Sequence, residues 1–151
     1  GKNYGISKYQ GFIDTATQEV EDRFGVNPYN VSMIIKTTLD TEKQDVINDL
    51  YNTYKWKNEV VQAGLAIVSV KDGSVVAVGA GRTKNSERSY NFATQLTKQI
   101  GSTAKPIFDY GPAVEYLGWG TENYIDDTPT TYSNGTKISN SDGGYKGRLP
   151  M

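Results

Sequence analysis

The chain of 151 residues is long enough to form one domain with a buried core, and its composition excludes several classes of protein. A formal net charge of −1 gives no case for binding nucleic acid, and the absence of cysteine excludes disulfides and thiolate metal sites. Because histidine is absent too, a zinc site would need carboxylates alone, so we expect no metal and no cofactor. No apolar run approaches the length of a membrane span, so we expect no membrane contact from this segment.

The first part of the chain predicts a linker and then a helix. Residues 1–10 are polar and contain glycine, which is typical of a linker or a frayed end. From Gly11 onward apolar residues recur at helical spacing, and Gly25 stands where helices commonly end. The apolar stripe consists of Ile13, Ala16, Val20 and Phe24. We therefore expect a helix over 11–24.

A strand and a second helix are predicted next. Apolar and polar residues alternate from Val31 to Leu39, which is the pattern of a strand with one buried side. The four residues from Thr41 to Gln44 have the form of a capping box, so a helix should open there and run to about Tyr54. Its shared apolar face would contain Val46, Ile47, Leu50, Tyr51 and Tyr54.

The centre of the chain predicts a β-hairpin. Ala63–Val70 and Ser74–Ala80 are both apolar, and Asp72-Gly73 between them is a strong turn signal because both residues tolerate a positive φ. Since both strands are apolar on both faces, we expect layers above and below this sheet. The polar residues from Arg82 to Tyr90 are expected to form a surface loop.

A third helix is expected to begin close to Ser102. Pro106 is tolerated only in the first turn of a helix, because it lacks an N–H and its ring crowds the preceding turn. Pro112 cannot donate a backbone hydrogen bond either, so we expect a kink or break near Gly111. The residues predicted to form a buried face are Ile107, Tyr110, Gly111, Val114 and Leu117.

Ser102 and Lys105 stand three residues apart in this first turn, which places them on one helical face. A serine hydroxyl needs a base to become a good nucleophile, and without histidine a lysine is a candidate. Burial and the positive end of the helix dipole would both favour a neutral Lys105 amine. The alternative is that Ser102 caps the helix and Lys105 points into water, and the tetrad alone favours that interpretation.

Beyond Gly118 the composition shifts to polar and turn-forming residues, with few apolar ones. Asn134-Gly135 is a turn signal and predicts a small hairpin between Thr130–Ser133 and Thr136–Ser139. We see no internal repeat and no separate second domain in the sequence.

The wider sequence around Ser102 resembles the transpeptidase domain of class A (bifunctional) penicillin-binding proteins. Asn91-Phe92-Ala93-Thr94-Gln95, Gly101-Ser102-Thr103-Ala104-Lys105-Pro106 and Ala113-Val114-Glu115 match that family in order, although Ile100 replaces a proline that is frequent there. Thr37-Thr38-Leu39-Asp40, the hairpin and Gly81-Arg82 resemble the family as well. The resemblance covers roughly residues 11–118.

This resemblance implies an α+β fold in which helices pack on an antiparallel sheet, as in a partial penicillin-binding transpeptidase or serine β-lactamase-like fold. It implies that residues 11–151 are the N-terminal part of a transpeptidase domain, with 1–10 as linker and the C-terminal part absent. Ser102 would be the nucleophile and Lys105 the base of a D,D-transpeptidase that acts on peptidoglycan stem peptides and is trapped by β-lactam antibiotics. The location implied is the extracellular face of the bacterial cytoplasmic membrane.

Two motifs that the family uses are not found after Ser102. A Ser-x-Asn triad relays the proton there, and a Lys-Thr-Gly or Lys-Ser-Gly strand binds the substrate carboxylate and supplies an oxyanion N–H. Tyr132-Ser133-Asn134 resembles the relay superficially, but it lies in a turn-rich segment too soon after Ser102. We therefore expect the isolated chain to be inactive, with the remainder of the transpeptidase domain as its partner.

Two other functions remain open on the sequence. One is a β-lactam-binding sensor module of the same fold, which would be acylated without turnover. The other is a β-lactamase, which would need a deacylating water and a base for it, and nothing outside the Ser102–Lys105 tetrad points to one.

Overall fold

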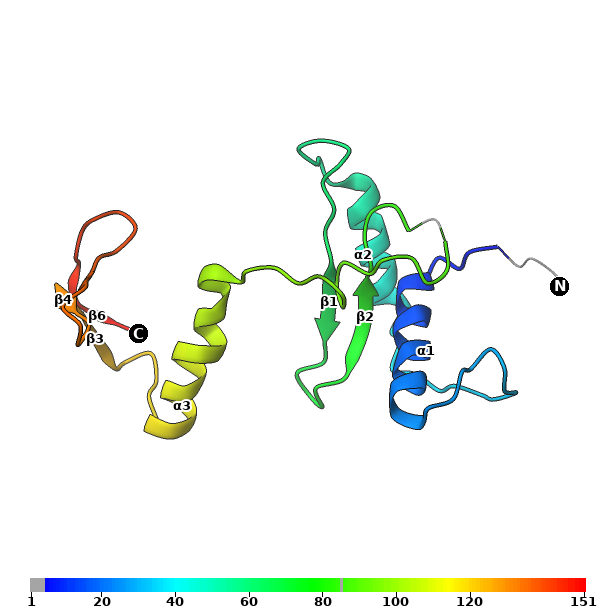
Figure 1. Cartoon of the computed structure of the whole chain (residues 1–151), viewed down its shortest axis with the longest axis horizontal. Helices are drawn as coiled ribbons and strands as arrows, with labels where there is room; N and C mark the ends of the chain where they lie inside the picture. Colours follow the sequence, from blue (N-terminus) through cyan, green and yellow to red (C-terminus); the bar gives the residue numbers. More distant parts are fainter. Residues whose placement is uncertain (1–4, 85) are drawn as a thin grey trace. The chain divides into compact units, whose positions relative to one another are not determined.

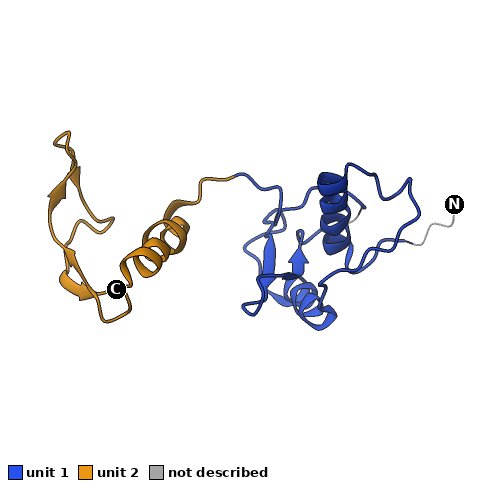
Figure 2. Cartoon of the chain, turned by 90° about the horizontal axis from the view of Figure 1, so that it is seen from below, with its two compact units in different colours: residues 1–97 blue, residues 98–151 orange. Residues whose placement is uncertain are grey.

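The computed structural model describes residues 5–84 and 86–151, and it divides the chain into two compact units. The first unit is Gly1–Thr97 and the second is Lys98–Met151 (Figure 2). No change of composition marks this boundary, because the shift at Gly118 falls inside the second unit. Of the expected linker over residues 1–10, residues 1–4 lie outside the described residues, and its last residue, Gln10, is already buried in a helix.

The first unit contains two helices and a two-stranded sheet (Figure 1). Helix α1 spans Gln10–Phe24 and ends at Gly25, whose φ of 64° is the left-handed conformation predicted for a terminating glycine. Helix α2 spans Thr41–Thr53. Both helices contact β2, so the two predicted helices are confirmed and serve as the scaffold of the sheet.

The capping residue of α2 differs from the prediction. Asp40, not Thr41, is the N-cap, and its Oδ1 accepts a hydrogen bond of 3.1 Å from the Lys43 N–H. Asp40 has the extended backbone that an N-cap requires, and its carboxylate also contacts the Lys43 ammonium. The Lys43 side chain and the backbone N–H together lower the pKa of Asp40 from its ordinary value.

The central hairpin is confirmed. Strands β1 (Leu65–Val68) and β2 (Val75–Gly79) pair antiparallel, with Leu65 opposite Gly79 and a shift of register after Ile67. In the turn, Gly73 has a φ of 73°, and the Asp72 Oδ1 accepts hydrogen bonds from both the backbone N–H and the hydroxyl of Ser74. Gly73 thus takes the positive φ that the Asp-Gly signal predicted, whereas Asp72 does not and contributes its side chain as the acceptor that fixes the turn.

Only β2 is enclosed in the way that the sequence predicted. Ala77 and Val78 are buried side by side in β2, although they point to opposite faces of the sheet. Ala66 and Val68 of β1 are exposed, so the expectation of cover on both faces of both strands is wrong for this unit. The buried apolar residues of the described chain are Phe12, Ile47, Ala77, Val78 and Ala80.

The segment from Val31 to Leu39 is not a strand, which corrects the prediction. It meets β2 only near its end, where the Thr38 hydroxyl donates to the Val75 carbonyl at 2.6 Å and the Asp40 N–H donates to the Val76 carbonyl at 2.9 Å. Further along β2, the edge is occupied by α2, because the side chain of Gln44 bonds the N–H and the carbonyl of Val78 at 2.9 and 3.0 Å. Because Thr38 meets Val75 and Asp40 meets Val76, the residues before Thr38 run back past Val75, where β2 begins. Residues 31–37 therefore have no length of β2 to pair with, and the alternating pattern alone does not create a strand.

The second unit begins with helical turns and ends with two small antiparallel pairs. Strand β3 (Tyr124–Asp127) pairs with β6 (Gly147–Pro150), and β4 (Thr130–Thr131) pairs with β5 (Lys137–Ile138). The hairpin predicted at Asn134-Gly135 is thus confirmed, with a φ of 81° at Gly135.

Candidate active site

Ser102 lies in a single 3₁₀ turn, η1 (Gly101–Ala104), which confirms that helical structure begins here. Gly101 has a φ of 54°, a conformation that glycine adopts without strain, and this lets the chain enter the turn. Ser102 is not a cap, because no side chain caps η1, and the hydroxyl that bonds the Ile100 carbonyl is that of Thr103. The Ser102 side chain is exposed and makes no hydrogen bond to any described residue.

Lys105 follows directly, and its backbone N–H donates to the Ser102 carbonyl. In a 3₁₀ turn, side chains three residues apart lie one above the other, so the two side chains leave the same side of the turn. The Lys105 side chain is exposed, as the alternative interpretation expected, and is not buried as the nucleophile–base interpretation required. Within the part of the chain that the structure describes, no hydrogen bond joins the Ser102 hydroxyl to the Lys105 amine, so the hydroxyl–amine contact expected of a nucleophile and its base is not formed.

The helix after Lys105 contains the irregularity predicted at Pro112. A π-helical turn, η2 (Pro106–Tyr110), leads into α3 (Gly111–Leu117), and the Gly111 N–H bonds the Pro106 carbonyl five residues back. Such a turn absorbs the hydrogen bond that Pro112 cannot make. The helix changes its hydrogen-bond pattern here and does not break.

The apolar face of this helix is exposed, which corrects the prediction that it is buried. Ile107 is 69 % exposed, and Val114 and Leu117 are 53 % and 64 % exposed. The periodicity predicted the helix correctly, but periodicity only shows that a face suits burial. It does not supply the surface that covers it.

The C-terminal sequence that resembles a proton relay is used by the turn that contains it. The Asn134 Oδ1 accepts a hydrogen bond of 3.0 Å from the Thr136 N–H, which fixes the turn between β4 and β5. Tyr132 contributes its backbone to the same turn, through bonds to Thr136 and Gly135. This local use of Asn134 gives no support to a relay at Tyr132-Ser133-Asn134.

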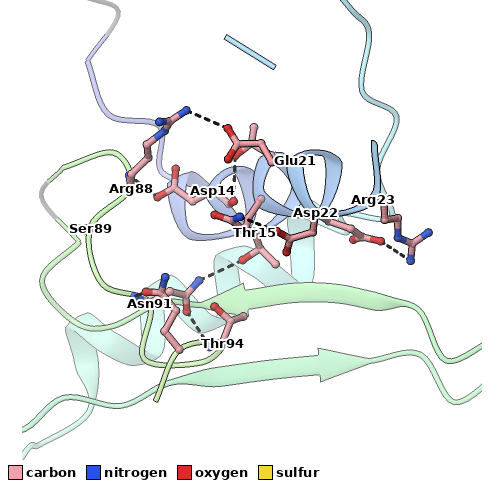
Figure 3. Close-up of a pocket in the computed structure, with 13 residues that line it drawn as sticks. Asp14, Thr15, Glu21, Asp22, Arg23, Arg88, Ser89, Asn91 and Thr94 are labelled. Carbon is pink, nitrogen blue, oxygen red and sulfur yellow. Dashed lines mark hydrogen bonds and ion pairs between the residues drawn. The ribbon is translucent and has the colours of Figure 1, made fainter. Parts of the chain in front are cut away.

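The sequence missed a cluster of polar contacts in the first unit, between α1 and the segment that precedes the candidate site (Figure 3). Lys84 was expected on a surface loop, but its ammonium forms a nearly buried ion pair of 2.6 Å with the Asp14 carboxylate. Arg82 turns inward too and donates to the Val61 carbonyl at 2.7 Å. Residues Asp14 and Lys84 are far apart in sequence, and no local pattern joins them, so only the fold reveals the pair.

Asp14 of this cluster also lines a pocket of about 570 Å³ that lies wholly in the first unit. Charged side chains on its wall are paired with one another, as Arg88 is with Glu21 and Arg23 is with Glu19. Asn91 is 4 % exposed and forms part of the same wall (Figure 3).

No group of acidic side chains among the described residues is arranged to hold a metal ion. In the same part of the chain, no helix is both long and apolar enough to cross a membrane.

A solved structure shares the fold of this chain. That structure, the penicillin-binding protein PonA1 from Mycobacterium tuberculosis, matches 95 % of the chain with a TM-score of 0.69, and the chain covers 36 % of that structure. The two sequences are 24 % identical, so this likeness shows the fold alone. The chain therefore has an α+β fold found in part of a penicillin-binding protein, as the sequence predicted.

Sequence relatives lead to the same family, although no protein-family model matches the chain. The chain is 40 % identical over 147 residues to penicillin-binding protein 1A/1B of Bacillus subtilis, and 33 % identical over 156 residues to penicillin-binding protein 1A of Streptococcus pneumoniae. Each match covers 96 % of the chain but only 16 % and 22 % of the relative. The chain thus corresponds to a segment of class A penicillin-binding proteins, which confirms the resemblance found in the motifs.

Proposed function

We propose that the chain is the N-terminal part of the transpeptidase domain of a class A penicillin-binding protein, with a role in peptidoglycan synthesis. The complete domain would be a serine D,D-transpeptidase, with Ser102 as its nucleophile and Lys105 as the base that accepts the Ser102 proton. The substrate would be the D-Ala-D-Ala end of a peptidoglycan stem peptide, and β-lactam antibiotics would react with the same serine.

One observation carries this proposal: Ser102 and Lys105 leave the same side of one helical turn, with the Ser102 hydroxyl free, inside a sequence that matches penicillin-binding proteins throughout. A hydroxyl bonded to its own helix would have to give up that bond to react, and Ser102 has none to give up among the described residues. Nothing in the second unit orients the Lys105 amine toward Ser102, and we assign that task to the remainder of the domain.

The proposed reaction has two acyl-transfer steps. The Ser102 oxygen bonds to the carbonyl carbon of the penultimate D-alanine, and the hydroxyl proton passes to the Lys105 amine. The amide C–N bond then breaks, and the terminal D-alanine leaves with a proton on its amine. An amine of a second stem peptide attacks the ester and releases Ser102, which regains its proton, and the two stems become cross-linked.

Assigning Ser102 as the nucleophile also implies which groups complete the site and where the protein works. The remainder of the transpeptidase domain would supply the oxyanion donors, the proton relay and the carboxylate-binding strand. The site would work at the extracellular face of the cytoplasmic membrane, where peptidoglycan is assembled.

Mass spectrometry of the whole protein after incubation with a β-lactam tests the proposal. We expect one covalent adduct, mapped to the peptide that contains Ser102, and none in the Ser102→Ala variant. Lys105→Ala should retain the adduct but form it about a hundred- to ten-thousand-fold more slowly, since that is the usual contribution of a general base. A covalent adduct in Ser102→Ala would contradict the assignment of the nucleophile.

Turnover distinguishes the transpeptidase from a β-lactam-binding sensor of the same fold. Release of D-alanine from a stem-peptide substrate, with formation of cross-linked product, supports the transpeptidase. A stable adduct on Ser102 without turnover of any stem peptide supports the sensor.

A further inference from the structure

The segment Asn91–Gln95, which we call the anchor run, is held more firmly than its irregular backbone suggests. The Asn91 side chain accepts a hydrogen bond of 2.9 Å from the Ala93 N–H, and the Gln95 side chain accepts one of 2.8 Å from the Asn91 N–H. The Gln95 N–H returns to the Asn91 carbonyl at 2.9 Å. These bonds close the anchor run into a compact turn.

The anchor run is also fixed to the hairpin. Its Phe92 N–H donates to the Ala80 carbonyl at 2.7 Å. Its backbone lies so close to Gly64 that a Cβ on this glycine would stand 2.3 Å from the carbonyl carbon and oxygen of Phe92. Backbone at both sides of this contact leaves no flexible group to yield, so the position of the run relative to the hairpin is tightly set.

A third attachment joins the anchor run to α1. The Asn91 Nδ2 donates to the Thr15 hydroxyl at 3.2 Å, and the Asn91 side chain is buried against the helix (Figure 3). Directly before Thr15, the Asp14 carboxylate accepts hydrogen bonds from the Lys84 ammonium at 2.6 Å and from the Arg88 N–H at 2.8 Å, which fixes the chain that enters the run. A buried amide whose nitrogen and oxygen are both hydrogen-bonded favours one arrangement, because a displacement would leave these polar atoms unpaired.

The anchor run is the last part of the first unit that is fixed in this way before Ser102. Residues 96–100 follow it without helix or strand, and Gly101 then starts the turn that carries Ser102. A short connection limits how far its two ends can separate, to about 3.3–3.6 Å per residue. The connection therefore limits the distance of Ser102 from the anchor run.

We propose that Asn91 is a positioning residue for the reaction of Ser102: through Thr15 and the hairpin it fixes the point from which the chain leads to the nucleophile. The inference rests on the proposed function of Ser102. It assigns no contact between Asn91 and the substrate, and its effect is on the rate of the chemical step and not on affinity.

The test compares the whole protein with two variants, Asn91→Ala and the milder Thr15→Val, which removes only the hydroxyl that Asn91 bonds. The Thr15 hydroxyl also donates to the Gly11 carbonyl within α1, so its loss removes a bond inside the helix as well. Thr17→Val is the matched control, because among the described residues the Thr17 hydroxyl bonds only carbonyls within α1, those of Ile13 and Asp14. The rate of acylation by a β-lactam is measured against its concentration for the folded fraction of each protein. Amide hydrogen exchange is followed over residues 96–105.

We expect the acylation rate at saturating β-lactam to fall about ten- to a hundred-fold in Asn91→Ala, since small misplacements of reacting groups cost this much. Thr15→Val should show a smaller loss in the same direction, Thr17→Val none, and the half-saturating concentration should change less than the rate. Exchange over residues 96–105 should become faster in Asn91→Ala and in Thr15→Val but not in the control.

Three outcomes would overturn the inference. Acylation of Asn91→Ala at the wild-type rate would show that the anchor run does not position Ser102, while leaving the proposed function intact. Equal losses in Thr15→Val and Thr17→Val would reduce the effect to general destabilisation of α1. Failure of the wild-type protein to be acylated at Ser102 would remove the proposed function and this inference with it.

Discussion

Tyr51 shows how one side chain of the first unit links packing to pH. Its hydroxyl donates to the Ala63 carbonyl at 2.7 Å, which joins α2 to the start of the hairpin, and its ring lies 6.3 Å from that of Trp56. Burial disfavours the phenolate and raises the pKa of Tyr51 from 10.0 to about 12. The folded chain therefore holds this proton more tightly than the unfolded chain does.

The consequence is a loss of stability at high pH. Tyr51 contributes its full stabilisation below the unfolded pKa of 10.0, and this is lost as pH rises toward the folded value of about 12. We expect the free energy of unfolding to decrease between about pH 9 and about pH 11.5 by more in the natural chain than in Tyr51→Phe. Thermal unfolding of both proteins at both pH values measures the difference, and parallel losses would contradict it.

The turn that carries the candidate site was predictable from the sequence, but the contact between its side chains was not. Ser102 and Lys105 could be found because their spacing and the adjacent Pro106 define a helical first turn, and the structure has that turn. Contact between their side chains depends on groups that pack around them, which local spacing does not encode. The role of Asn91 was hidden for a related reason, since its partner Thr15 is far away in sequence.

At the scale of elements, the close packing of β2 on α2 depends on the absence of a side chain at Gly79. A Cβ at this position would lie 2.3 Å from the Tyr51 hydroxyl oxygen and 2.7 Å from the Ile47 Cγ2. Gly79→Ala should therefore separate the strand from the helix and lower the free energy of unfolding by about 1–3 kcal/mol. Denaturant unfolding of the chain checks this.

A second substitution separates steric crowding from other effects of Gly79→Ala. Tyr51→Phe removes the oxygen that the new methyl group would meet first, at the cost of the bond to Ala63. Gly79→Ala should then cost less in the Tyr51→Phe background than in the natural chain. An equal cost in both backgrounds would show that crowding against the hydroxyl is not the cause.

Elements whose signals are local were predicted well. Gly25 ends α1 and Asp72-Gly73 turns the hairpin because each requires only its own backbone conformation. The strand expected from Val31 to Leu39 is absent because this segment reaches β2 only at Thr38, which meets Val75 at the start of β2. Alternation of apolar residues cannot reveal whether a partner strand lies alongside.

At the scale of the whole molecule, the exposed face of α3 and the unengaged Lys105 support the expectation that residues 1–151 alone react poorly with β-lactams. Losing a single oxyanion donor costs about a hundred- to a thousand-fold in rate, and both the donor strand and the relay are expected elsewhere. We predict that residues 1–151 alone are not acylated by penicillin at a useful rate. Adding the C-terminal remainder of the domain should restore labelling at Ser102.

Mass spectrometry of the isolated chain, with and without the added remainder, gives the answer. Ser102→Ala, mixed with the same remainder, is the control for labelling elsewhere. A rapid stoichiometric adduct on Ser102 of the isolated chain would show that the site is already complete.

The outer edge of β2 is already hydrogen-bonded, so the sheet of the first unit can be extended only at its other edge. Gln44 bonds both backbone groups of Val78 as a neighbouring strand would, while Asp40 and Phe92 donate to the carbonyls of Val76 and Ala80 on either side. A strand from another nascent chain finds these groups already bonded and cannot template on them. During synthesis, this flank can therefore be protected against mispairing before the second unit has left the ribosome, and new strands can be added only beside β1.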